Sequence, residues 1–251
     1  MDRRQKLLDG CAVHSERGIE FGPLANPLVS KEEGPIFYLD YTSAENLRLK
    51  SAADPNVDAS AIVDVDFNLE EGSLTEICGP SAPFCYVVAS HVFEHLPNPM
   101  GWLREISALI RPGGIVSLAI PDRRYTYDYF RSTTTCAQLV ANDRDQLSRP
   151  SSTQLADHFF NVRVVDTVAA WSATPLIESC DRYHPDAQVL YLLDLGIAGQ
   201  YMDCHCTVWT MEQFEQVFPE AVRLLDLPFT LRASHAPATY SNEFIVQLQR
   251  N

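Results

Sequence analysis

Short apolar runs alternate with segments of helical periodicity through the first 120 residues. The apolar runs predict strands at residues 18–22, 35–41, 61–67, 84–90 and 115–120. Helical spacing predicts helices at 3–13, 44–53 and 99–110, the last ending at a proline and glycine stop signal. Strands that alternate with helices predict an α/β fold, with a parallel sheet and helices on both faces.

The alternation breaks after Ile120. Residues 121–200 are polar and irregular, with predicted helices at 136–142 and 152–171. We interpret 121–200 as a largely helical insertion after the fifth strand, a lid on a single domain that spans residues 1–251. A helix at 210–218 and two β-type segments, 221–232 and 243–249, then close the chain. A terminal hairpin beside a parallel sheet predicts a mixed sheet.

Composition narrows the classes of partner. The chain has 251 residues, of which 46% are hydrophobic, as expected of one globular domain with a proper core. The formal net charge of −14 repels phosphate backbones and anionic membranes, so we expect neither as a partner. No signal peptide or membrane-spanning run is evident, and we expect a cytoplasmic monomer or homodimer with reduced cysteines.

Candidate ligand-binding residues follow the predicted strands. In open α/β sheets, ligands bind outside the carboxyl ends of the strands. A glycine there permits close backbone approach, and a carboxylate can accept hydrogen bonds from two ribose hydroxyls. Each such residue also has a simpler interpretation, as a turn glycine or a solvated acid. The candidates, in strand order, are Glu20 and Gly22, Asp40, Asp66, and Ser90 with His91.

Histidines raise the question of a metal. His91 and His95 are four residues apart, so on a helix they share one face. This spacing suits a pair of metal ligands, but more often one of the two residues simply stands at the start of a helix. Cys204-His205-Cys206 provides two ligands at best, because alternate residues of an extended segment point to the same side. We therefore predict no metal, with His205 facing the pocket.

Aromatic residues follow the fifth strand directly. Tyr125 and Tyr127 could orient a substrate or stack on a cation, although a helix start with solvated charges is an equal alternative. Free imidazole titrates near pH 6.5, so His95 and His205 are the best candidates for a general base.

One stretch resembles a known family. The segment FCYVVASHVFEHLP (84–97), followed by WLREI (102–106) and LIRPGG (109–114), resembles class I S-adenosylmethionine (SAM)-dependent methyltransferases of the type 11 group. IPDRRYTYDYFR (120–131) and HCTVWTMEQF (205–214) resemble a bacterial subgroup of them. Two features depart from the family pattern: the loop at 22–27 lacks the later glycines, and Cys85 replaces a common aspartate.

The resemblance implies a Rossmann-like seven-stranded sheet with an antiparallel last strand. It also implies SAM, with S-adenosylhomocysteine as product, bound across the ends of the first, second and fourth strands. Glu20 and Gly22 match the first motif, Asp40 the ribose acid and Asp66 the adenine-side acid. Ser90 and His91 match positions that flank the methionine part of SAM.

Three functions fit these residues. The first is methyl transfer to a small-molecule oxygen or nitrogen nucleophile, with His95, His205 and Tyr125 as catalytic residues. We expect the insertion to build the acceptor pocket, where Tyr125, Tyr127, His158 and His205 would meet His91 or His95. The second is a reaction of SAM with no external acceptor, by cyclisation or elimination. The third is a non-catalytic scaffold.

Overall fold

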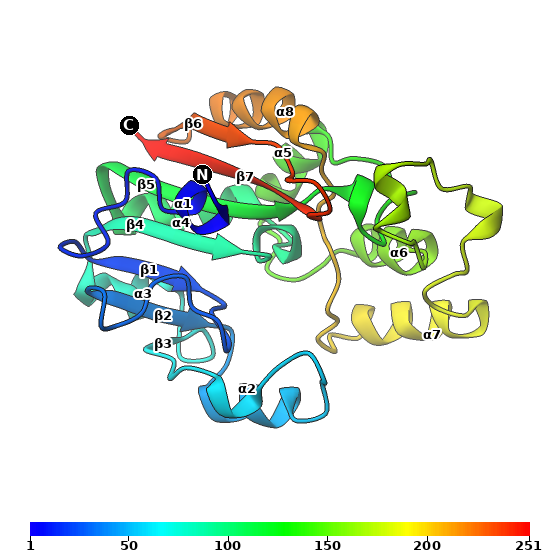
Figure 1. The fold of residues 1–251 in the computed structure, drawn as a ribbon, viewed down its shortest axis with the longest axis horizontal. Helices are drawn as coiled ribbons and strands as arrows, with labels where there is room; N and C mark the ends of the chain where they lie inside the picture. Colours follow the sequence, from blue (N-terminus) through cyan, green and yellow to red (C-terminus); the bar gives the residue numbers. More distant parts are fainter.

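A seven-stranded mixed sheet forms the centre of the computed structural model, which describes all 251 residues (Figure 1). The strand order is β3-β2-β1-β4-β5-β7-β6, and β7 runs antiparallel to the other six strands. The predicted mixed α/β sheet is thus confirmed. The strands are β1 (Gly18–Phe21), β2 (Ile36–Asp40), β3 (Phe67–Asn68), β4 (Phe84–Ser90), β5 (Ile110–Pro121), β6 (Phe229–His235) and β7 (Glu243–Arg250).

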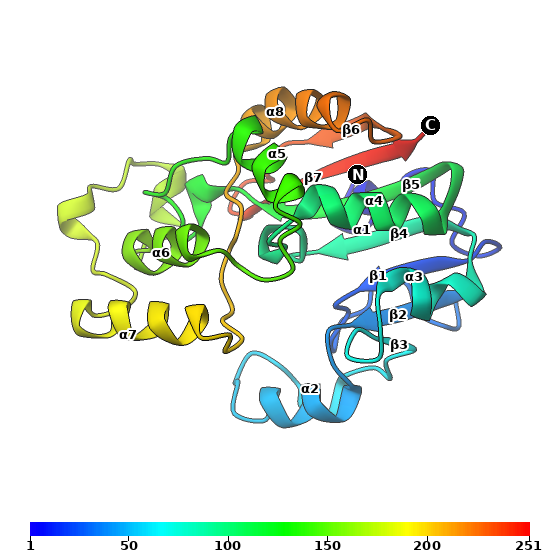
Figure 2. The ribbon, with the colours of Figure 1, turned by 180° about the vertical axis from the view of Figure 1, so that it is seen from behind.

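Helices cover both faces of the sheet. Four of them, α3, α4, α5 and α8, lie on one face, and α1 lies on the other (Figure 2). No helix is both long enough and apolar enough to cross a lipid bilayer. The helices are α1 (Arg3–Leu7), α2 (Ala44–Ser51), α3 (Leu74–Cys78), α4 (Pro99–Leu109), α5 (Cys136–Arg144), α6 (Ser152–Asn161), α7 (Asp186–Ile197) and α8 (Met211–Leu224).

Helix α8 corrects the predicted end of the chain. The sequence predicts a helix that stops at Phe218 and a strand from Ala221, but the helix continues through Pro219 to Leu224. Phe214, Phe218 and Ala221 form one fully buried stripe against the sheet. Burial of this stripe outweighs the hydrogen bond that a proline removes from a helix interior.

Strand β3 is much shorter than predicted. The sequence predicts a strand at 61–67, but only Phe67 and Asn68 pair with β2. Upstream of them, the Asp66 carboxylate accepts the amide of Tyr38, and the amide of Val63 donates to the Leu24 carbonyl. Side-chain and loop bonds therefore replace the expected ladder. The first helix is also shorter than predicted, ending at Leu7 before Gly10, which has a φ of +75°.

The insertion divides into two parts. Helix α5 packs on α4 and α8, on the face of the sheet. Helices α6 and α7 pack on each other and form a lobe beyond the carboxyl ends of β1, β2 and β4 (Figure 1). The predicted helix at 152–171 ends at Asn161, where the chain turns extended and Arg163 bridges to Arg182. Helix α7 was not predicted.

Candidate active site

Glu20, at the end of β1, holds the loop that follows it. Its buried carboxylate accepts the backbone amides of Leu28 at 2.7 Å and Val29 at 3.2 Å. Burial raises the pKa of Glu20 to about 7, although these amides act in the opposite direction. Within the loop, Gly22 has a φ of +61°, and Leu24 takes the same left-handed region at +46°. The loop therefore turns tightly even though it lacks the later glycines of the family pattern.

The carboxylate of Asp40, at the end of β2, has one oxygen that is not hydrogen-bonded to the protein. Its side chain is buried, and Oδ1 accepts the amide of Tyr41 at 2.8 Å, while no protein donor binds Oδ2. Burial raises the pKa of Asp40 to about 6. A buried carboxylate with an unused oxygen is well suited to accept bonds from the hydroxyls of a ligand.

Asp66 already has partners for both oxygens. Lys31 Nζ lies 2.6 Å from Oδ1, and the Tyr38 amide donates to Oδ2 at 2.8 Å. This carboxylate anchors the segment before β3 to β2. The contact of Asp66 with an adenine amino group stays a prediction. It would require a lone pair of the carboxylate that neither Lys31 nor Tyr38 uses.

Ser90 and His91, at the end of β4, join a polar cluster that includes both ends of the chain. Arg3 Nη2 donates to Ser90 Oγ at 2.6 Å, and His91 Nε2 lies 2.9 Å from Glu243 Oε2. Burial disfavours the imidazolium of His91, but Glu243 and Glu94 outweigh it and raise the pKa of His91 to about 9. Arg3 and Glu243 were missed by sequence reasoning, because nothing local connects them to β4.

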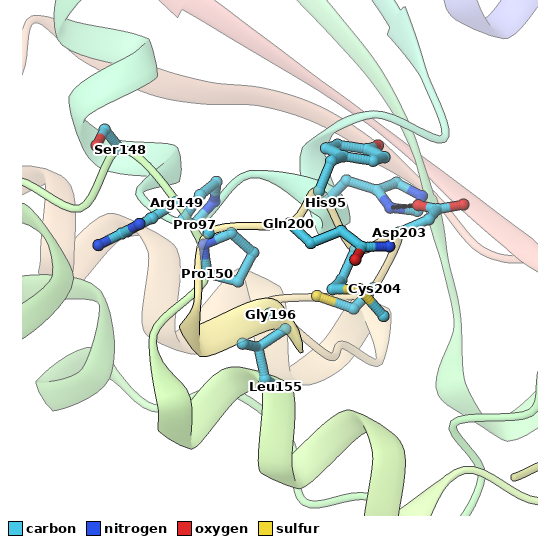
Figure 3. Close-up of a pocket in the computed structure, with 13 residues that line it drawn as sticks. His95, Pro97, Ser148, Arg149, Pro150, Leu155, Gly196, Gln200, Asp203 and Cys204 are labelled. Atoms are coloured by element: carbon cyan, nitrogen blue, oxygen red, sulfur yellow. Dashed lines mark ion pairs between the residues drawn. The ribbon is translucent and has the colours of Figure 1, made fainter. Parts of the chain in front are cut away.

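A second cluster, of Glu94, His95 and His205, lies just beyond β4. The rings of His95 and His205 are perpendicular, with centroids 4.8 Å apart. Glu94 Oε1 lies 3.8 Å from His95 Nε2, and neither oxygen of Glu94 accepts a hydrogen bond, although the residue is only 1% exposed. His95 Nδ1 lies 2.9 Å from the carboxylate of Asp203 (Figure 3).

Buried polar partners orient the ring of His205. Its Nδ1 lies 2.5 Å from Asp128 Oδ2, and its Nε2 lies 2.7 Å from the Tyr127 hydroxyl. Burial favours the neutral form of Asp128, but the bond from His205 and the charge of Arg131 outweigh it and hold the pKa of Asp128 at about 2. Asp128 is therefore ionised and stabilises positive charge on His205.

Tyr127 and His158 lie beside His205 as expected, whereas Tyr125 does not. Tyr127, and not Tyr125, lies against His205, while Tyr125 stacks on Trp171 with centroids 4.0 Å apart. His158 accepts the amide of His205 through Nδ1 at 3.3 Å. Burial, followed by the charge of Arg131, lowers the pKa of His158 to about 3, so this ring is neutral. The catalytic role of Tyr125 stays a prediction.

A cavity of about 260 Å³ lies beside His95, between the α6–α7 lobe and the loop that follows β4 (Figure 3). Leu155 of α6, Gly196 of α7 and Asp203 are among its lining residues. Tyr201, which also lines it, stacks on Tyr41 with centroids 5.6 Å apart, directly after Asp40. The segment after α7 therefore connects the lobe to the end of β2.

A family model described as a methyltransferase domain matches residues 17–166, which is more than half of the chain. The chain belongs to this methyltransferase domain family. The seven-stranded mixed sheet is that of class I SAM-dependent methyltransferases. The matched part of the methyltransferase domain includes Glu20, Asp40, Glu94 and Tyr127, whereas Tyr201 and His205 lie beyond it.

Solved structures resemble this chain at low sequence identity. A Rhodobacter sphaeroides structure described provisionally as a zinc-dependent alcohol dehydrogenase is 14% identical, with a TM-score of 0.50, over 100% of this chain and 90% of that one. The CcbJ methyltransferase of Streptomyces caelestis is 13% identical, with a TM-score of 0.48, over 99% and 88%. A SAM-dependent methyltransferase of Mesorhizobium loti is also 13% identical, with a TM-score of 0.45, over 95% and 92%. No curated protein matches the chain.

Proposed function

We propose that this protein transfers the methyl group of SAM to an oxygen or nitrogen atom of a small molecule held beneath the α6–α7 lobe. The observation that supports this most is the Glu94–His95–His205 cluster, which lies beside a cavity just beyond β4. The resemblance to SAM-dependent methyltransferases implies that the end of β4 flanks the methionine part of SAM. The cluster would then lie next to the reacting methyl group.

SAM itself supplies the activated methyl group in this reaction. The acceptor atom attacks the methyl carbon in line, the carbon–sulfur bond breaks, and its electron pair stays on sulfur to give S-adenosylhomocysteine. The protein mainly positions the two reactants. Asp40 and the loop after Gly22 would hold SAM, and the lobe would hold the acceptor. Where the acceptor starts protonated, its proton must move to a nearby group, and His95, or His205 once the Tyr127 hydroxyl turns away, would receive it.

The cavity favours an external acceptor over a reaction of SAM with itself, because its space lies beside the cluster and is bounded by the lobe. The buried carboxylate of Glu94, which accepts no hydrogen bond, argues against a non-catalytic scaffold, since burying such a group without partners is costly. The acidic surface argues against nucleic-acid acceptors.

Calorimetry with SAM tests the proposal directly. We expect a dissociation constant in the micromolar range or tighter, about −8 kcal/mol or better. Mass spectrometry should then detect S-adenosylhomocysteine only when small hydroxyl or amine acceptors are added. Conversion of SAM alone would support the self-reaction instead. No heat and no thermal shift at millimolar SAM would contradict every SAM-dependent function.

The affinity for SAM should fall as the pH drops through about 6. The reason is that protonation of Asp40, whose pKa is raised to about 6, removes an acceptor for the ribose hydroxyls. Each charge-assisted bond contributes about 1.5–3 kcal/mol, so Asp40→Ala should lose at least about tenfold in affinity at pH 7.5. Calorimetry between pH 5 and 8 measures both effects.

The variant Asp40→Asn shows whether Asp40 or another acid causes the pH dependence, because an asparagine side chain does not titrate in this range. We expect the variant to bind weakly and with a flat pH profile, whereas exposed Asp64→Asn should behave as wild type. An unchanged slope in Asp40→Asn would assign the titration to another group, such as Glu20.

A further inference from the structure

Glu94 is a buried carboxylate without a donor. It is 1% exposed, and neither Oε1 nor Oε2 accepts a hydrogen bond from the protein. A charge left unpaired in the interior costs several kcal/mol, so such groups normally bind a cation or lose their charge. The nearest groups facing it are imidazole nitrogens, Nδ1 of His91 at 3.5 Å and Nε2 of His95 at 3.8 Å.

We propose that Glu94, His95 and His205 bind a divalent metal cation. One ligand atom from each of the three residues lies within 4.8 Å of those from the other two. Bonds of about 2.1 Å around one ion require ligand atoms about 3.4 Å apart in a tetrahedral arrangement, so small side-chain rotations complete the site. The site differs from the Cys204-His205-Cys206 motif, and it replaces the sequence-based expectation of no metal.

A carboxylate lies beside the Nδ1 atom of each histidine, and the one beside His205 orients that ring as a metal ligand. His95 Nδ1 faces Asp203 at 2.9 Å, and His205 Nδ1 faces Asp128 at 2.5 Å. A carboxylate can only accept, so Nδ1 of His205 holds the proton, and its Nε2 keeps a lone pair that now faces the Tyr127 hydroxyl. Nδ1 of His95 lies close to Asp203 but forms no hydrogen bond there. Carboxylate–histidine pairs of this kind fix the tautomer and orientation of metal-binding imidazoles.

Local charge also favours a cation. Three carboxylates, those of Glu94, Asp128 and Asp203, surround the two rings. Arg131 is the buried cation of the group, but it bonds to Asp128 and Asp157. No arginine or lysine pairs with Glu94 or Asp203, whose charged neighbours are the imidazoles of His91 and His95.

The donor set indicates the kind of metal. Two imidazoles and one carboxylate suit Zn²⁺, Mn²⁺ or Fe²⁺ better than Mg²⁺ or Ca²⁺, which prefer oxygen ligands. Three protein ligands leave at least one position for a water or a substrate, as in catalytic sites. The Tyr127 hydroxyl, now 2.7 Å from His205 Nε2, must turn away or become a further ligand.

A role for this cation rests on the proposed methyl transfer. An acceptor oxygen bound at the open position would lose its proton more readily, because a cation lowers the pKa of a bound hydroxyl. His95 and His205 then act as metal ligands and not as general bases. The cation would position an acceptor with a hydroxyl, or two adjacent ones, at the edge of the cavity.

Titration of the metal-free protein with ZnCl₂ or MnCl₂ tests the site without any substrate. After dialysis against a chelator, calorimetry should show one ion per chain with a micromolar or lower dissociation constant. Glu94→Gln and His95→Asn should each weaken binding at least tenfold, and exposed His14→Asn should not. Circular dichroism and urea unfolding confirm that each variant is folded.

Two results would overturn the proposal. One is wild-type metal affinity in both folded variants, Glu94→Gln and His95→Asn. The other is loss of binding only in Cys204→Ser/Cys206→Ser, which would place the ion on the thiols. SAM titrations of the same samples keep the two proposals separate. Metal binding without SAM binding would remove the proposed function and leave the site, and the reverse result would remove the site alone.

Discussion

Replacement of His205 by alanine is expected to lower the turnover of methyl transfer about 100-fold or more, with SAM affinity unchanged. Loss of a positioned proton acceptor costs about 10²–10⁴-fold in rate, and loss of a ligand to a catalytic cation has an effect at least as large. The ring lies in the cluster with Glu94 and His95 and is not among the residues expected to hold SAM, so cofactor binding should not depend on it. The measurements are the rate of S-adenosylhomocysteine formation with an acceptor found by screening, and SAM titration by calorimetry.

The matched control is His235→Ala. His235 ends β6, at the far edge of the sheet from β1 and β2, and has no contact with the cluster. This variant should turn over at the wild-type rate. A wild-type rate in His205→Ala would place the chemistry elsewhere, even if the lobe still binds the acceptor.

Arg131→Met is expected to lower the free energy of unfolding by about 3–5 kcal/mol. Removing one partner of a buried ion pair leaves the other charge uncompensated, which typically costs that much. Arg131 is 1% exposed, and its guanidinium binds Asp128 at 2.7 Å, Asp157 at 2.7 Å and the carbonyl of His205 at 2.9 Å. Methionine keeps much of the apolar stem and removes the charge. Urea unfolding followed by circular dichroism measures the change.

Arg182→Met is the control for Arg131→Met. Its ion pair with Asp186 is exposed, with side-chain exposures of 39% and 78%, and pairs of this kind contribute about 1 kcal/mol or less. Equal losses in the two variants would show that the buried network does not stabilise the fold beyond a surface pair. Because Asp128 orients His205, a loss of turnover in folded Arg131→Met is also expected.

The sequence by itself determined four parallel strands of the sheet and the residues that follow them. Apolar runs predicted β1, β2, β4 and β5, because burial on both faces of a parallel sheet requires continuous apolar strands. The end of a strand is set by local signals, so Gly22 and Asp40 could be assigned to the carboxyl ends of β1 and β2 without a structure. The same holds for Ser90 and His91, which directly follow the apolar core of β4. The stop signal at 111–114 likewise indicated the start of the apolar part of β5.

Only the tertiary structure decided which of these side chains meet. Local periodicity could not show that Glu94 faces His205, that Tyr127 and not Tyr125 reaches that ring, or that Arg3 bonds to Glu243. Nor could it extend α8 through Pro219, where burial of an apolar stripe outweighs the local cost of proline. Periodicity and turn residues act over a few positions, whereas these contacts depend on where the insertion crosses the sheet and on the burial of charges that require partners.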